Sequence, residues 1–120
     1  MKRILIVDDD AELRDMLCAT LSEAGYEVAT AADGTEASAI LKTKRPEIVI
    51  TDVYMPSKDG LEILLDLRQH FPDIKVIAMS GGVAKENILE AFKELGASST
   101  LVKPFEPAEL LRAVEQVAKE

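Results

Sequence analysis

Residues 4–10 of the chain have the sequence Ile4-Leu5-Ile6-Val7-Asp8-Asp9-Asp10. Four consecutive apolar residues are too few for a helix and are typical of a strand buried on both faces of a parallel sheet. Three aspartates then end the apolar run, and no small-residue cleavage site follows, which argues against a secretory leader. This stretch therefore predicts a buried strand whose carboxyl end carries acidic side chains.

Strand-like and helix-like segments alternate along the remaining chain. Further strands are predicted at residues 26–30, 47–51, 74–79 and 99–102, and the strand at 47–51 ends at Asp52. Helices are predicted at residues 13–24, 33–42, from 61 onward, 84–95 and from 107 onward. Five strands, each followed by a helix, predict an α/β fold with helices on both faces of one parallel sheet. We expect residues 1–120 to form one domain, because no linker or repeat interrupts the pattern.

Local signals support several of these helices. Asp33, with Glu36 three residues later, resembles a capping box, and Pro107 suits the first turn of the last helix. The first helix is predicted from Leu13, Met16, Leu17, Thr20, Leu21 and Ala24. The helical spacing that defines the third helix comes from Leu61, Leu64, Leu65 and Arg68.

Composition excludes several classes of function. A net charge of −8 argues against direct binding of nucleic acid, which depends on basic side chains. No apolar run approaches the roughly 18 residues that cross a bilayer. The single Cys18 cannot form an intramolecular disulfide, and we expect it to be partly exposed in a reducing, cytoplasmic compartment. The single His70 lacks partner ligands for a metal, and we expect it to be exposed.

Polar side chains follow four of the predicted strands at the points where the strands end. They are Asp8 and Asp9, Asp52, Ser80 and Lys103. In open α/β sheets ligands bind at the carboxyl ends of the strands where strand order reverses, which for an order 2-1-3-4-5 lies between strands one and three. Three crowded carboxylates repel one another, and a Mg²⁺ ion would resolve the conflict because it prefers oxygen ligands.

Each of these residues alone has an ordinary structural explanation. Aspartates after the first strand suit a helix start, and we expect Asp10 to be the N-cap. Asp52 alone would be a turn residue, and Lys103 alone a surface lysine. Capping does not explain a further carboxylate at the tip of another strand. The coincidence at four strand ends therefore favours a site.

The same residues carry a resemblance to a known family. Ile6–Asp9, Asp52–Pro56 with Gly60, Met79–Gly81 and Leu101–Phe105 occur in order on the expected strand ends. With them the chain resembles, over its whole length, the receiver domain of bacterial two-component response regulators. The flavodoxin-like order 2-1-3-4-5 is that of the family's chemotaxis member and is inherited from this resemblance.

The resemblance implies a role for each site residue. Asp52 would be the phosphoacceptor, with Mg²⁺ bound directly by Asp9 and largely through water by Asp8. The backbone carbonyl of Tyr54 would complete the protein ligands. Ser80 would move toward the phosphoryl group, Lys103 would pair with it, and the Lys103–Pro104 peptide bond would be cis.

The implied function is signalling rather than turnover of an external substrate. A sensor histidine kinase or phosphotransfer protein would supply the phosphoryl group, and the domain would catalyse only its own phosphorylation and dephosphorylation. The added charge would then change the surface of the fourth helix, fifth strand and fifth helix. This surface would bind a downstream protein or an output domain, or would form a phosphorylation-dependent dimer. Neither nucleic acid nor a membrane is expected as a direct partner.

Two positions depart from the commonest family pattern. Thr100, the switch position three residues before Lys103, is usually aromatic. Tyr54 is bulky where smaller polar residues are frequent, and we expect it to slow the attack of water on the phosphorylated form. Three rival functions fit the residues less well. A haloacid-dehalogenase phosphatase needs an aspartate at position 54, where this chain has Tyr54, and Asp8, Asp9 and Asp10 would repel the phosphate of a flavin in a flavodoxin-class electron carrier. The intact acceptor, metal and lysine positions count against a receiver-like domain used only for binding.

Overall fold

A five-stranded parallel sheet lies at the centre of the computed structural model, which describes residues 2–53, 60–81 and 85–119, with only the backbone for 85–87. The strand order is β2-β1-β3-β4-β5, as the flavodoxin-like fold predicts. The strands are β1 (Arg3–Val7), β2 (Glu27–Ala31), β3 (Ile48–Asp52), β4 (Lys75–Ser80) and β5 (Ser99–Val102). Order reverses beside β1, so the ends of β1 and β3 adjoin, with Val7 opposite Thr51.

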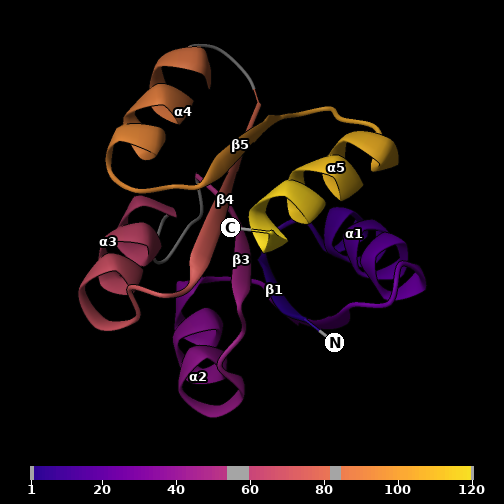
Figure 1. The fold of residues 1–120 in the computed structure, drawn as a ribbon, viewed down its shortest axis with the longest axis horizontal. Coiled ribbons are helices and arrows are strands. Elements are labelled where there is room, and N and C mark those ends of the chain that lie inside the picture. Colours follow the sequence, from indigo (N-terminus) through magenta and orange to yellow (C-terminus); the bar gives the residue numbers. More distant parts are fainter. Residues whose placement is uncertain (1, 54–59, 82–84, 120) are drawn as a thin grey trace.

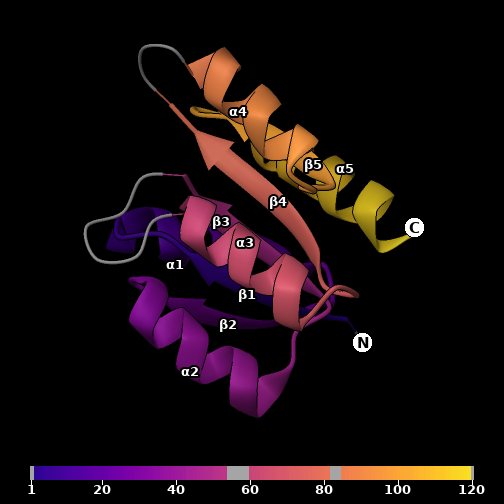
Figure 2. The ribbon, with the colours of Figure 1, turned by 90° about the vertical axis from the view of Figure 1, so that its left-hand side faces the viewer.

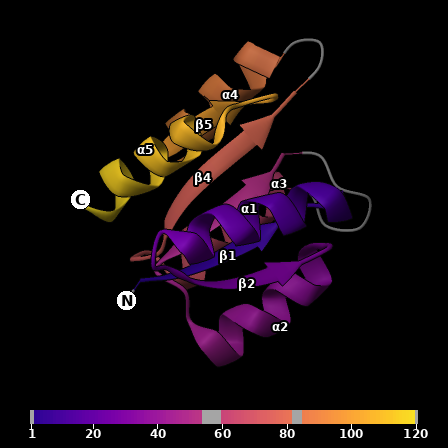
Figure 3. The ribbon, with the colours of Figure 1, turned by 90° about the vertical axis from the view of Figure 1, so that its right-hand side faces the viewer.

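Five helices cover the two faces of this sheet. They are α1 (Ala11–Glu23), α2 (Gly34–Lys44), α3 (Gly60–His70), α4 (Lys85–Glu94) and α5 (Pro107–Ala118). Helices α2, α3 and α4 lie on one face, and α1 and α5 lie on the other (Figure 1). The two side views separate the layers, with α3 in front of the strands in Figure 2 and α1 in front of them in Figure 3.

The core consists of two apolar clusters, one on each face of the sheet. Side chains alternate between the faces along a strand, so Leu5 and Val7 belong to one cluster and Ile4 and Ile6 to the other. Both sets are buried, which confirms the predicted strand. Packing on both faces of the sheet therefore fixes the ends of the strands, and with them the polar residues that follow.

Most predicted boundaries agree with the structure to within one or two residues. The second, third and fourth strands each lie one residue later than predicted, and α2 extends to Lys44 rather than residue 42. Such shifts are expected, because the last hydrogen bond of an element depends on its neighbours rather than on its own side chains.

The leucines that predicted α3 are only partly on its buried face, since Leu64 is buried and Leu61 and Leu65 are not. Ile63, Leu64 and Leu67 are buried, whereas Leu61 and Leu65 are 37% and 48% exposed. Because leucines lie on both sides of α3, the sequence pattern does not show which side is apolar. The side that packs against the sheet is the one that also carries Ile63. Met16 of α1 is likewise 38% exposed, although its spacing placed it on the predicted apolar stripe.

Helix starts follow the predicted signals with one difference. Asp10 is the N-cap of α1, and its Oδ1 accepts hydrogen bonds from the backbone of Glu12 and Leu13. Asp33 caps α2 by accepting from Glu36 N, but the Glu36 carboxylate accepts from Ala32 N rather than closing the capping box on Asp33. As predicted, α5 begins with Pro107.

Three smaller expectations concern single residues and the membrane. His70 is exposed, as expected, and Cys18 is half-buried and packs against the cluster beneath α1 and α5. Across residues 2–53, 60–81 and 85–119, no helix combines the length and hydropathy that a bilayer crossing requires.

Candidate acidic site at the carboxyl ends of the strands

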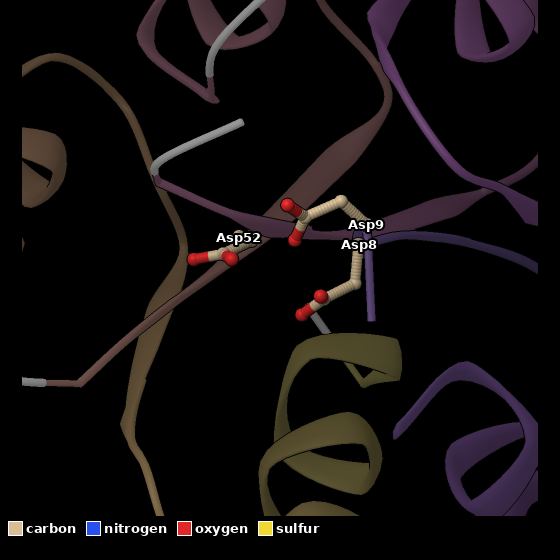
Figure 4. Close-up of side chains that lie close together, drawn as sticks. All are labelled: Asp8, Asp9 and Asp52. Atoms are coloured by element: carbon tan, nitrogen blue, oxygen red, sulfur yellow. The ribbon is translucent and has the colours of Figure 1, made fainter. Parts of the chain in front are cut away.

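Three carboxylates meet where β1 and β3 end. Asp8 and Asp9 follow β1, Asp52 is the last residue of β3, and one oxygen from each lies within 4.8 Å of the others. Figure 4 shows the three side chains gathered at the strand ends. At an effective dielectric near 20, two charges about 4 Å apart repel by roughly 4 kcal/mol, so a positive charge near these carboxylates stabilises the cluster.

Asp8 is the most firmly held member of the cluster. It is fully buried, and its Oδ1 accepts a hydrogen bond of 2.9 Å from Asp10 N. Its backbone N–H donates to the carbonyl oxygen of Ala31. Its own carbonyl accepts a 2.7 Å hydrogen bond from Arg14 Nη1. Asp8 is therefore positioned by β2, α1 and its own loop together.

Lys103 connects the acidic residues electrostatically. Its Nζ lies 2.8 Å from Asp8 Oδ2 and 3.3 Å from Asp52 Oδ2. Burial by itself lowers the pKa of Lys103. The hydrogen bond to Asp8 and the negative charges of Asp52 and Asp8 outweigh burial, so the pKa is raised above its ordinary value of 10.5. Lys103 is thus a firmly protonated cation between two of the carboxylates.

The backbone at Asp52 is closely packed by the start of α3. A Cβ atom on Gly60 would lie 2.3 Å from the carbonyl oxygen of Asp52 and 2.8 Å from Val53 Cα. Only glycine permits this approach without displacement. The buried Thr51 hydroxyl also donates to the Asp52 carbonyl, at 3.0 Å. These contacts fix the direction in which Asp52 leaves β3.

Of the other predicted residues, Ser80 ends β4 and Thr100 lies in the neighbouring strand β5. Ser80 is fully buried at the end of β4, and its hydroxyl donates over a long 3.5 Å to the carbonyl of Gly81. The backbone of Lys103 donates to Ser80 O, which joins the ends of β4 and β5. Thr100 is half-buried in β5, and Tyr54 lies outside the described residues. The predicted cis peptide bond between Lys103 and Pro104 is present.

The arrangement fits a hard divalent cation. The oxygen ligands that the site offers belong to three carboxylates that differ in exposure: Asp8 is buried, Asp52 is half-buried and Asp9 is exposed. Mg²⁺ prefers such oxygen ligands and keeps several of its waters, so one side of the site must be open to solvent. Asp9 provides that open side.

Sequence reasoning missed two residues of this site. Arg14 was not recognised, although a cation in the first turn of a helix opposes the helix dipole and was a usable signal. Thr51 was assigned only to a strand, because its contact with the next carbonyl depends on the local backbone. Both act on the backbone of an acidic residue, which side-chain patterns do not reveal.

The fold and the site together define a flavodoxin-like α/β protein with an acidic, lysine-paired cluster at the topological switch point. Residues 4–115 match the family described as the response regulator receiver domain. The chain therefore belongs to this family, whose members are the receiver domains of two-component signalling. They are signalling modules and not enzymes in the usual sense, and the resemblance seen in the sequence is confirmed.

Individual relatives agree with this assignment. The chemotaxis protein CheY of Thermotoga maritima is 39% identical over 119 residues, which cover 98% of both chains. A probable transcriptional regulator, ycf27, of Cyanophora paradoxa is 44% identical over 110 residues. That match covers 91% of this chain and 45% of the relative. Some relatives are therefore as long as this chain, and in others it spans less than half the length.

Solved structures show the same fold. The chemotaxis protein CheY4 of Vibrio cholerae superposes with a TM-score of 0.88 at 38% identity, over 98% of both chains. A structure of NtrX from Brucella abortus in complex with ADP gives a TM-score of 0.94 at 28% identity. That match covers 98% of this chain and 27% of the NtrX chain. The receiver fold thus occurs both as a separate chain and within longer ones.

Proposed function

We propose that this domain is switched by phosphorylation of Asp52 in a Mg²⁺-dependent reaction, with a sensor histidine kinase or phosphotransfer protein as donor. The observation that carries the proposal is the meeting of Asp52, Asp8 and Asp9 within 4.8 Å, with Lys103 3.3 Å from Asp52. This combination provides a nucleophile, a cation site and a fixed positive charge at one place. Its place at the strand ends is that of the family's acidic site.

The reaction can be written with the residues of this chain. A carboxylate oxygen of Asp52 attacks the phosphorus of a phosphohistidine, the P–N bond breaks, and the imidazole leaves with the electron pair. Lys103 stabilises the negative charge on the transferred group, since its Nζ is already beside Asp52. Bound Mg²⁺, held by Asp8, Asp9 and Asp52, would supply further neutralisation of that charge.

Removal of the phosphoryl group follows the same logic. Water attacks the phosphorus, the bond to Asp52 breaks, and inorganic phosphate leaves with the carboxylate restored. The domain would catalyse only these two reactions on itself, by positioning and charge compensation. The carbonyl of Tyr54 is proposed as a further metal ligand because the resemblance to the receiver family implies it.

The output surface is proposed to lie over α4, β5 and α5. Adding about −1.5 to −2 charges at Asp52 would draw the Ser80 hydroxyl toward the phosphoryl oxygens and shift the connection to β5. Thr100 lies in this strand as the switch residue. Val102 of β5 is 40% exposed and Leu95 after α4 is 44% exposed, which supports an apolar contact with a partner, an output domain or a second copy. We propose that the phosphorylation and the binding of the partner take place in the cytoplasm.

Intact mass measurement tests the proposal. The protein is incubated with Mg²⁺ and a small phosphodonor such as acetyl phosphate, and a gain of one phosphoryl group is expected. Asp52→Asn should lose the gain, and Asp73→Asn, an exposed aspartate after α3, should retain it. A wild-type chain that gains nothing would count decisively against the proposal and favour a domain used only for binding.

A further inference from the structure

Arg14 makes an unusual contact within the site. Its Nη1 donates a 2.7 Å hydrogen bond to the carbonyl oxygen of Asp8, and its side chain is half-buried. No carboxylate of the described residues forms an ion pair with Arg14. The Arg14 guanidinium therefore has the backbone carbonyl of Asp8, and not a carboxylate, as its partner.

The stability of α1 does not explain an arginine at this position. Arg14 lies in the first turn of the helix, where its backbone N–H donates to the carbonyl of the N-cap Asp10. A positive charge at the amino end of a helix opposes the helix dipole, and acidic residues are favoured there. The benefit of Arg14 must come from outside the helix.

The contact holds the peptide group that joins Asp8 to Asp9. Lys103 and Asp10 N hold the two carboxylate oxygens of Asp8, and the bond to Ala31 holds its N–H. The contact with Arg14 fixes the remaining group, the carbonyl. The plane of this peptide sets the direction of the exposed Asp9 side chain.

We propose that Arg14 is a positioning residue for the cation site. It orients the peptide between Asp8 and Asp9 so that the Asp9 carboxylate converges with those of Asp8 and Asp52. The inference rests on the proposed function, in which Mg²⁺ occupies this cluster. Residues that orient metal ligands typically change metal affinity by about 10- to 100-fold when they are substituted.

A guanidinium also acts on the site through its charge, and this effect has the opposite sign. Coulomb repulsion between Arg14 and a divalent cation would weaken binding, whereas positioning of the ligands strengthens it. Removal of Arg14 therefore distinguishes the two effects by the direction of the change. A purely packing role, through the aliphatic part of the side chain, predicts no change in Mg²⁺ affinity.

The test measures Mg²⁺ binding by isothermal titration calorimetry in the full chain and in three variants. Arg14→Met keeps the aliphatic stem but loses the donors and the charge, and its dissociation constant for Mg²⁺ is expected to rise about 10-fold. Arg14→Lys keeps the positive charge but loses the planar guanidinium group. Its dissociation constant for Mg²⁺ is expected to lie between those of Arg14→Met and wild type. Arg112→Met, an exposed arginine of α5, is the matched control and should bind as wild type does.

Each outcome decides the inference. Equal or tighter Mg²⁺ binding by Arg14→Met would overturn it, since charge or packing alone would then explain the residue. If Arg14→Met does not fold by circular dichroism, Arg14→Lys decides in the same way, and unchanged affinity overturns the inference. A wild-type chain that binds no Mg²⁺ and gains no phosphoryl group would instead reject the proposed function. Wild-type binding matched by both Arg14 variants rejects only the role of Arg14.

Discussion

The Nζ atom of Lys103 lies 2.8 Å from Oδ2 of Asp8, although the two residues are 95 positions apart in the chain. Asp8 is fully buried, so this ammonium group is the cation that accompanies a carboxylate removed from water. A buried charge without a partner is costly in free energy. The pair therefore favours a fold in which the end of β5 lies beside the end of β1. The positions of these strands thus depend partly on a pair that also serves the site.

The pH dependence of stability should reveal this pair. The pKa of Lys103 is raised in the folded state, so its contribution is fully present below its ordinary value of 10.5 and is lost as the pH rises through the folded value. In Mg²⁺-free buffer we expect Lys103→Met to reduce the free energy of unfolding by about 1.5–3 kcal/mol. The difference from wild type in urea titrations should be equal at pH 7 and pH 9 and should shrink above pH 10.5.

Lys93→Met, at an exposed lysine of α4, is the control for loss of a positive charge. It should leave stability almost unchanged at all these pH values. A Lys103→Met variant as stable as wild type at pH 7 would show that the contact does not stabilise the fold.

Mg²⁺ should stabilise the folded chain through Asp9. An ion that binds only the folded state at about 100 times its dissociation constant adds about 2.7 kcal/mol. We expect Asp9→Asn to lose most of this increase in thermal scans with and without Mg²⁺, because it removes the exposed ligand of the cluster. Asp15→Asn, at an exposed aspartate of α1, should keep the full increase; an equal loss in both variants would argue for a nonspecific effect.

Gly60→Ala should affect both stability and phosphorylation. The new Cβ would lie 2.3 Å from the Asp52 carbonyl, so the start of α3 must move, at a cost of about 1–3 kcal/mol. Because the Asp52 backbone moves with it, we expect slower phosphorylation by acetyl phosphate. Gly25→Ala is the comparison. An alanine at the φ of +97° of this residue should lower the free energy of unfolding by about 1–2 kcal/mol. Its Cβ atom would have no atom within 4 Å, so the phosphorylation rate should be unchanged.

The phase of α3 can be tested with two adjacent leucines. Leu64 is fully buried and Leu65 is 48% exposed. Leu64→Ala should therefore destabilise the fold by about 2–5 kcal/mol. Leu65→Ala should change the free energy of unfolding by no more than about 0.5 kcal/mol. Similar losses in urea titrations of the two variants would contradict the buried face described above.

Tyr54 is expected to lengthen the phosphorylated lifetime. It lies outside the described residues, so the expectation comes from the size of its side chain two residues after Asp52. Tyr54→Asn should dephosphorylate faster, as followed by loss of the phosphoryl mass with time. Tyr54→Phe keeps the bulk and should retain the wild-type lifetime. Without an acceleration in Tyr54→Asn, the idea of shielding from water must be abandoned.

The class of fold and the identity of the acidic residues could be predicted from the amino-acid sequence. Apolar runs such as Ile4–Val7 are local patterns, and strands buried on both faces require them whatever their neighbours are. Carboxyl ends of parallel strands share one edge of a sheet, so Asp8, Asp9 and Asp52 were expected to meet before any distance was known. Asp10 as helix cap followed from the preference for aspartate at the start of a helix.

The contacts between particular groups, and the buried face of each helix, depend on how the helices and strands pack together. The buried side of α3 depended on the sheet, because leucines on both sides of the helix made the local pattern ambiguous. The contact of Arg14 with the Asp8 carbonyl and that of Gly60 with the Asp52 carbonyl involve backbone atoms, which every residue possesses. Sequence patterns record side chains, and contacts with the backbone arise only when the chain is folded.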